Sequence, residues 1–287
     1  MDIRSIEFSG GGDAAAAIEL RAAGARMVVV HGVGPRIAWF GAARLPNFLF
    51  WDESLQHHRG DWYLRGGHRL WLTRPSADES EETYEPDNAR CTWQRRGGGI
   101  EVVQPPTRAG IEKTLAIRER DGRWIVEHRL RNVGTMLWSG GAWALTCTRP
   151  DARTRYRVPF GAPQPGWDAV TMVMPRAWGG DHTSRLADSQ LVMKEDALEI
   201  RPRRAEAKRM LRTRPGTLEM LDDARGTFRI HAVPVPGGAY PLDCNVAVYI
   251  GRARFMVELE TMSPLTTLAP GERLIHRETW ALDRAPA

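Results

Sequence analysis

Short stretches of alternating apolar and polar residues, separated by turn-forming residues, run along the whole chain. Residues 17–21 and 26–31 flank a turn at 22–25, and residues 91–95 and 100–104 flank Gly97-Gly98-Gly99. Asp121-Gly122 lies between two further stretches, and this dipeptide is a strong hairpin signal. The same pattern predicts strands at 36–40, 112–118, 124–131, 142–148, 155–159, 190–193, 197–201, 208–213, 216–221, 227–231, 244–250, 254–261 and 274–282.

No stretch carries a sustained helical period with caps, so the sequence predicts an all-β, mostly antiparallel sandwich or barrel. Neither a repeat nor a shift in composition divides the chain, and residues 1–287 are therefore predicted to form a single domain.

Composition is that of an ordinary soluble globular protein, with 42% hydrophobic and 26% charged residues. No apolar run approaches the roughly 18 residues needed to cross a bilayer, and the start, Met1-Asp2-Ile3-Arg4, lacks the pattern of a signal peptide. Cys91, Cys147 and Cys244 are widely spaced and form neither a disulfide framework nor a metal knuckle. We therefore predict a cytoplasmic protein with reduced, buried thiols and no membrane partner.

The net charge of +5 hints at anionic partners, but most arginines alternate with acidic residues and indicate a solvated surface. One exception is the basic run at residues 201–214. No aromatic residue is interleaved with it and no nucleic-acid-binding motif surrounds it, so a nucleic-acid partner is not favoured. A solvated edge strand and loop is the prediction for this run.

Two stretches far apart in the sequence carry the candidate chemistry. Residues 65–71 (Arg-Gly-Gly-His-Arg-Leu-Trp) place two glycines before a histidine and an arginine. Residues 255–264 alternate, so that Glu258 and Glu260 share one face of a strand whose other face is apolar. If the two stretches meet, the histidine, the arginine and the carboxylates would line one polar cleft.

These stretches resemble a bacterial family of uncharacterised function within the galactose mutarotase-like (aldose 1-epimerase-like) superfamily. Matching residues extend from about 36 to 282 and include 84–88 (Tyr-Glu-Pro-Asp-Asn), 131–134, 142–146, 258–265, 268–272 and 279–282. The resemblance implies a β-supersandwich of two large, mostly antiparallel sheets that binds a sugar on a concave face.

The resemblance also suggests roles for individual residues. In aldose 1-epimerases a late glutamate takes the proton of the anomeric hydroxyl and a histidine protonates the ring oxygen, so that the ring opens and recloses. Glu260 resembles that base, and Arg69 resembles the arginine that holds sugar hydroxyls. The epimerase pattern of Asn-His and two aromatic residues is absent, with residues 142–145 in its place. His68 is therefore the predicted acid, and His182 is the reserve candidate.

Further residues are predicted to contact a sugar. Indole rings pack on the C–H faces of sugars, although core packing is the alternative for each tryptophan. The substrate-binding candidates besides Arg69 are Trp71, Trp143, Trp178, Glu258, Asp87 and Asn88.

The histidines at 57, 58, 128 and 276 are not predicted to act on a sugar. His128 and His276 share strand faces with apolar residues and are predicted to be core histidines. His57-His58 lacks a third ligand at helical or hairpin spacing. No metal and no other cofactor is therefore predicted.

The leading hypothesis is a carbohydrate-binding protein that takes a small sugar or sugar derivative, with aldose 1-epimerase-like isomerase activity as its enzymatic form. A non-catalytic sugar-binding or sensing module is an alternative, which the missing epimerase histidine pattern favours. A phosphosugar-specific epimerase would use arginines on the phosphate, and a lyase- or hydrolase-associated domain is a weaker alternative. The sequence leaves the sugar and the oligomeric state open.

Overall fold

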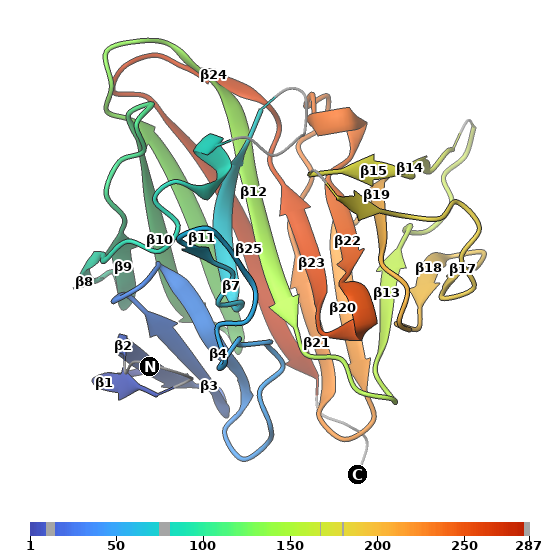
Figure 1. Ribbon diagram of the computed structural model, residues 1–287, viewed down its shortest axis with the longest axis horizontal. Coiled ribbons are helices and arrows are strands. Elements are labelled where there is room, and N and C mark those ends of the chain that lie inside the picture. The colour runs from blue at the N-terminus through green and yellow to red at the C-terminus, as the bar shows by residue number, and fades with distance from the viewer. Residues whose placement is uncertain (10–14, 75–80, 167, 180, 284–287) are drawn as a thin grey trace.

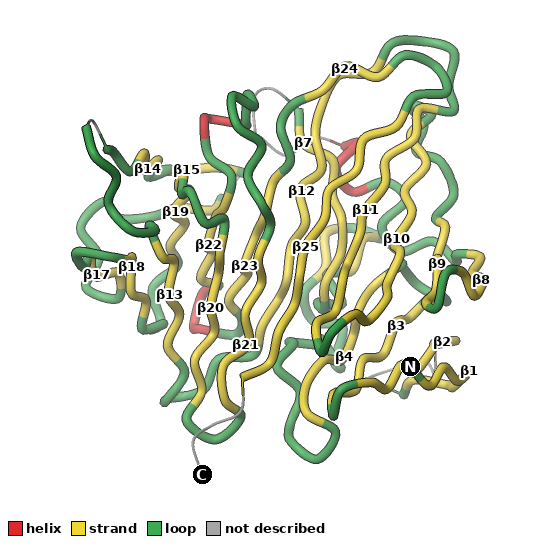
Figure 2. The backbone as a smooth tube through the Cα atoms, turned by 180° about the vertical axis from the view of Figure 1, so that it is seen from behind, coloured by secondary structure: helices red, strands yellow, loops and turns green. Residues whose placement is uncertain are grey.

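Two large antiparallel sheets face each other in the computed structural model, which describes residues 1–9, 15–74, 81–166, 168–179 and 181–283 (Figures 1 and 2). In order, the first sheet contains β1 (Asp2–Phe8), β2 (Ala15–Ala22), β3 (Ala25–Val30), β4 (Arg36–Ala42), β7 (His68–Thr73), β12 (Trp138–Thr148), β23 (Val257–Met262), β22 (Val246–Ile250), β19 (Ala207–Arg212) and β14 (Thr171–Val173), with β24 (Thr266–Leu268) paired to the start of β12.

The second sheet runs β17 (Leu191–Met193), β18 (Ala197–Ile200), β13 (Arg155–Pro159), β20 (Thr217–Asp222), β21 (Gly226–His231), β25 (Arg273–Asp283), β11 (Arg123–Asn132), β10 (Ile111–Arg120), β9 (Gly99–Val103) and β8 (Thr92–Arg96). Two small hairpins pair β5 (His58–Arg59) with β6 (Trp62–Tyr63) and β15 (Ala177–Trp178) with β16 (His182–Thr183). The helical segments are the 3-10 turns η1 (Glu81–Tyr84), η2 (Pro241–Asp243) and η3 (Arg252–Arg254).

The main core fills the space between the two sheets. Its centre holds Phe40 from the first sheet and Trp124, Phe228 and Trp280 from the second, with ring centroids 5.1 to 6.1 Å apart. Tilted and edge-to-face contacts of this kind stabilise aromatic clusters beyond the area that they bury. Strand alternation then leaves the opposite face of each sheet for other side chains.

The predicted all-β, antiparallel architecture is confirmed, and so are the hairpins. Asp121-Gly122 joins β10 to β11 with Arg120 opposite Arg123, and Gly97-Gly98 joins β8 to β9. Cys91, Cys147 and Cys244 are free and buried, as expected. Within the described ranges, no helix is long and apolar enough to pass through a bilayer. The assignment of residues 1–287 to one domain stays a prediction.

Two strand predictions are corrected. The predicted strand at 254–261 begins only at Val257, because Ala253 and Arg254 adopt positive φ angles of 57° and 61° in the η3 turn. The basic run is a solvated loop only in part: Arg201, Arg203 and Arg204 are exposed as predicted. Its strand, β19, lies between β22 and β14, and both Lys208 and Arg209 are buried. Arg209 is accommodated because its guanidinium donates to the backbone carbonyls of residues 185 and 186.

Candidate functional site

A tight turn at Gly66-Gly67 directs β7 into the first sheet. Both glycines have positive φ angles, of 79° and 70°, and the amide of Gly67 donates to the carbonyl of Phe50 at 2.7 Å. A Cβ at Gly66 would lie 2.4 Å from that carbonyl oxygen, and one at Gly67 would lie 2.5 Å from the carbonyl oxygen of Ile37. Other residues would therefore be strained at both positions. The glycine pair thus allows the backbone of this turn to approach residues 37 and 50 closely.

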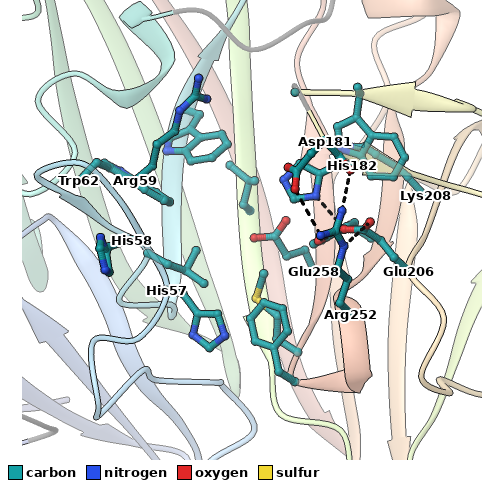
Figure 3. Close-up of a pocket in the computed structure, with 18 of the residues that line it drawn as sticks. His57, His58, Arg59, Trp62, Asp181, His182, Glu206, Lys208, Arg252 and Glu258 are labelled. Carbon is teal, nitrogen blue, oxygen red and sulfur yellow. Dashed lines mark hydrogen bonds and ion pairs between the residues drawn. The ribbon is translucent and has the colours of Figure 1, made fainter.

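A pocket of about 770 Å³ lies on the face of the first sheet that points away from the second sheet (Figure 3). Its floor consists of side chains from five adjacent strands, β7, β12, β23, β22 and β19. The 56–64 segment forms one wall, and residues 178, 179, 181 and 182 with residues 252, 253, 255 and 256 form the other. Six of the residues predicted from the sequence line this pocket: Arg69, Trp71, Trp143, Trp178, His182 and Glu258.

Glu258 supplies the carboxylate of the pocket floor. Its Oε1 accepts from Nη2 of Arg69 at 3.4 Å and from Sγ of Cys147 at 3.2 Å. The Arg69 guanidinium lies 4.5 Å from the ring centre of Trp71, which fixes its orientation. Oε2 of Glu258 forms no hydrogen bond or ion pair with the residues that the structure describes, and so remains available to a ligand.

Glu260 lies on the same strand face as Glu258 but does not line the pocket. It is fully buried beneath Trp143, whose Nε1 donates to Oε2 at 2.8 Å, and Lys208, whose Nζ lies 3.2 Å from Oε1. Burial raises the pKa of Glu260 and the Lys208 cation opposes this rise, while Glu258 adds to it. The residue predicted as the base therefore sits one layer below the pocket surface.

His182 faces the pocket from the other wall and is held by a carboxylate. Its Nδ1 lies 2.7 Å from Oε1 of Glu206, and its ring stacks on Trp178 at 5.7 Å. Burial raises the pKa of Glu206, but hydrogen bonds from Tyr249 and His182, together with Arg252, outweigh it and lower the pKa. An ionised carboxylate therefore fixes the imidazole. Its Nε2 forms no hydrogen bond with a residue in the described ranges and can meet a ligand.

A second imidazole, His57, faces the pocket from the opposite wall. Nδ1 of His57 lies 3.0 Å from Oδ2 of Asp52, and its ring stacks on Phe255 at 4.1 Å. Burial alone would raise the pKa of Asp52. Hydrogen bonds from the backbone amide and ring of His57 and from the hydroxyl of Ser54 outweigh this effect, and the pKa is lowered. In the view of Figure 3, Glu258 projects between the His57 and His182 rings.

Asp87 and Asn88 are placed behind the pocket wall instead of in its lining. Oδ2 of Asp87 accepts from the indoles of Trp62 at 2.8 Å and Trp71 at 3.2 Å, and pairs with Arg36 at 2.9 Å. Asn88 donates to the carbonyl of Tyr63 and accepts from Arg36. These residues were predicted to contact a sugar, and the structure shows them orienting the aromatic side chains that do line the pocket.

His68 is the one predicted catalytic residue that points away from the pocket. Successive residues of a strand face opposite sides, so Arg69 faces the pocket while His68 enters the space between the sheets. It is completely buried, with Nε2 lying 2.8 Å from Nε2 of His128 and Nδ1 lying 2.9 Å from Oγ1 of Thr146. The expected meeting of His68, Arg69 and Glu260 in one cleft is therefore wrong for His68.

Several residues of the site were missed from the sequence. Lys208 was overlooked because it lies in a run of basic residues. It shares one face of β19 with Met210, which belongs to the same hydrophobic cluster as Trp143. Glu206, Tyr249, Asp52 and Cys147 belong to no local motif, because each acts on a partner far away in the sequence. His57 was considered only as a metal ligand. The signal that could have identified it is an acidic residue, Asp52, five residues earlier in the sequence.

The fold is similar to that of solved galactose mutarotase-like proteins. One from Clostridium acetobutylicum aligns with a TM-score of 0.63 and 10% identity over 98% of this chain and 98% of that chain. One from Lactobacillus casei gives a TM-score of 0.60 and 10% identity over 93% of this chain and 100% of that chain. An Escherichia coli K12 protein, provisionally described as an aldose 1-epimerase, aligns with a TM-score of 0.61 and 13% identity over 93% of this chain and 98% of that chain.

No known family profile matches the sequence, and no curated protein matches it. At these low identities the structural likeness establishes the fold and not the activity. The chain therefore has the galactose mutarotase-like fold, a β-supersandwich, as the resemblance implied.

Proposed function

We propose that the pocket binds a neutral sugar and catalyses the interconversion of its anomers. The observation that carries the proposal is the arrangement of the carboxylate on the pocket floor, Glu258, with the carboxylate-held imidazole of His182 in a cavity lined by aromatic rings. The similar fold of a protein provisionally described as an aldose 1-epimerase adds support.

Glu258 and His182 are connected across the floor of the pocket. Tyr249 lies opposite Glu258 in the β22–β23 pair, and its hydroxyl donates to Oε1 of Glu206, which holds His182. In the proposed reaction, Oε2 of Glu258 takes the proton of the anomeric hydroxyl while the protonated His182 gives its Nε2 proton to the ring oxygen. The C1–O5 bond breaks, the open-chain aldehyde rotates about C1–C2, and the reverse transfers close the ring.

The charge balance of the lining favours a neutral sugar over a phosphorylated one. Arg69 is paired with Glu258, Lys208 with Glu260, and Arg252 with both Asp181 and Glu206. Arg59 is the remaining cation of the lining, and it pairs with no carboxylate of the described residues. A phosphate is usually bound by several unpaired cations or backbone amides, so the phosphosugar alternative has less support.

Proton NMR exchange between the anomers of glucose, galactose and other aldoses tests the proposal. Glu258→Gln and His182→Gln should each reduce the accelerated exchange by about 10²- to 10⁴-fold, while sugar affinity changes little. His57→Gln is the matched control, because it removes an equally placed imidazole from the other wall, and it should change the rate less than about tenfold.

Unchanged exchange in Glu258→Gln would contradict the assigned base. Calorimetric binding of aldoses by the natural chain without any accelerated exchange would instead support the non-catalytic sugar-binding module. Absence of both binding and exchange with every aldose would overturn the proposed function as a whole.

A further inference from the structure

A group of three buried side chains lies between the sheets, behind the pocket. His68 comes from β7 in the first sheet, and His128 and Glu278 come from β11 and β25 in the second sheet. One potential ligand atom of each lies within 4.8 Å of the other two. The side chains of His68 and Glu278 have no solvent exposure, and His128 is 2% exposed.

Both imidazoles point their Nε2 atoms toward one another instead of toward separate partners. The two Nε2 atoms are 2.8 Å apart, and Nε2 of His68 lies 3.7 Å from Oε2 of Glu278. A single ion between the two rings could therefore contact both Nε2 atoms, which are common ligand atoms for metal ions.

Glu278 is a buried carboxylate without a cationic partner. Its Oε1 accepts from the hydroxyl of Thr261 at 2.5 Å, and its Oε2 accepts from the indole of Trp280 at 2.8 Å. No lysine or arginine in the described part of the chain forms an ion pair with it. An isolated buried carboxylate is costly unless it is protonated or neutralised by a cation.

Surrounding groups orient two of the three side chains, those of His68 and Glu278. Thr146 fixes His68 through Nδ1 at 2.9 Å, and Trp280 and Thr261 fix the carboxylate of Glu278. Hydrogen bonds of this kind to the outer atoms of ligands are typical of metal sites. A small cavity of about 10 Å³, lined in part by Leu70, Leu115 and His128, adjoins the cluster.

We propose that His68, His128 and Glu278 form a site for a divalent transition-metal ion, with Zn²⁺ the best match, that links the two sheets. Two imidazoles and one carboxylate are a common zinc donor set. The ion would replace the proton shared by the two Nε2 atoms, and those atoms would separate to roughly 3.3 Å, the spacing of tetrahedral ligands at zinc. Its charge would neutralise Glu278.

Metal analysis of the full-length protein tests the proposal. The protein is unfolded in chelator, refolded with or without Zn²⁺, dialysed, and analysed by mass spectrometry of the metal content. We expect about one zinc ion retained per chain and a higher melting temperature after refolding with zinc. Refolding with Co²⁺ should give the visible absorption bands of a low-symmetry site with nitrogen and oxygen ligands.

Variants place the ion within the molecule. Glu278→Gln keeps an acceptor for Trp280 and Thr261 but loses the charge, and should weaken zinc retention by at least about tenfold. His57→Gln with His182→Gln removes the two pocket imidazoles and should retain zinc fully. If Glu278→Gln does not fold, as judged by circular dichroism, His128→Gln provides the same comparison. Zinc-free natural protein after both refolding protocols, or zinc lost only with the pocket histidines, would overturn the proposal.

Discussion

Arg69 and His68 are neighbours in the sequence, yet their side chains lie on opposite sides of β7. Arg69 pairs with Glu258 in the pocket, and His68 contacts His128 between the sheets. The strand thus serves two polar environments that share no side chain. A change at His68 is therefore expected to affect stability, whereas a change at Arg69 is expected to affect the pocket directly.

The first prediction concerns the buried pair of Lys208 and Glu260. Lys208→Met removes the cation but keeps the aliphatic stem over Trp143, so that Glu260 is left buried without a counter-charge. Breaking a buried ion pair lowers the free energy of unfolding by roughly 3 to 5 kcal/mol. We expect a loss near the lower end of this range, because Glu260 can take up a proton. Urea denaturation at pH 7 measures the loss.

A double variant separates charge from packing. Lys208→Met with Glu260→Gln removes both charges, keeps an acceptor for Trp143, and should recover most of the lost stability. The single variant should also lose stability as the pH rises, since only a protonated Glu260 is tolerated there. Equal stability losses in the single and double variants would show that the ion pair contributes little.

The second prediction concerns the wall behind the pocket. Asp87→Asn leaves Arg36 buried without its counter-charge and weakens the acceptor for the indoles of Trp62 and Trp71. We expect a loss of roughly 3 kcal/mol in unfolding free energy and a weaker affinity for sugars, because the aromatic wall loses its fixed orientation. Glu85→Gln, a change at a neighbouring and more exposed carboxylate, is the control. Retained stability and affinity in Asp87→Asn would contradict the supporting role.

The third prediction follows from the charge balance of the lining. Because Arg69, Lys208 and Arg252 are each paired within the protein, binding of a neutral sugar should change less than about twofold between 50 mM and 500 mM salt. Arg59→Gln should leave that affinity nearly unchanged. Calorimetric titration measures both. Tighter binding of a sugar phosphate with a steep salt dependence would restore the phosphosugar alternative.

The sequence predicted the sheets well because alternation and turn residues are local signals. Asp121-Gly122 and Gly97-Gly98 defined their hairpins, and the alternation of Glu258 and Glu260 placed both carboxylates on the correct face of β23. Alternation also separates His68 from Arg69, and the predicted shared cleft did not take this signal into account.

The remaining errors concern contacts between distant segments. Whether Glu258 or Glu260 reaches the surface depends on Trp143 and Lys208, which come from two other strands. The carboxylate that holds His182 is 24 residues away, at Glu206, and no spacing rule connects them. Local pattern therefore located the pocket-facing strand, whereas the depth of each side chain required the folded structure.

The fourth prediction concerns the pH dependence of stability that the buried cluster produces. Burial lowers the pKa of His68 to about 3 and of His276 to about 4, and that of His128 well below its ordinary value. Between pH 6.5 and about 4.5 these three histidines are therefore protonated in the unfolded chain but remain neutral in the folded protein. Stability contributed by the neutral histidines is therefore lost as the pH falls below 6.5.

Glu278 acts in the opposite direction, because burial raises its pKa to about 7. Its protonated form contributes stability below pH 4.5, and this contribution is lost as the pH rises through 7. On unfolding, the three histidines take up protons and Glu278 releases one, a net uptake of up to roughly two protons. The free energy of unfolding should therefore fall by up to about 2.7 kcal/mol for each pH unit of acidification. In chelator, urea denaturation between pH 4.5 and 7.5 should show a shallower acid loss for His276→Gln and a steeper one for Glu278→Gln than for the natural chain. Identical slopes in all three proteins would mean that these buried groups do not govern the acid stability of the fold.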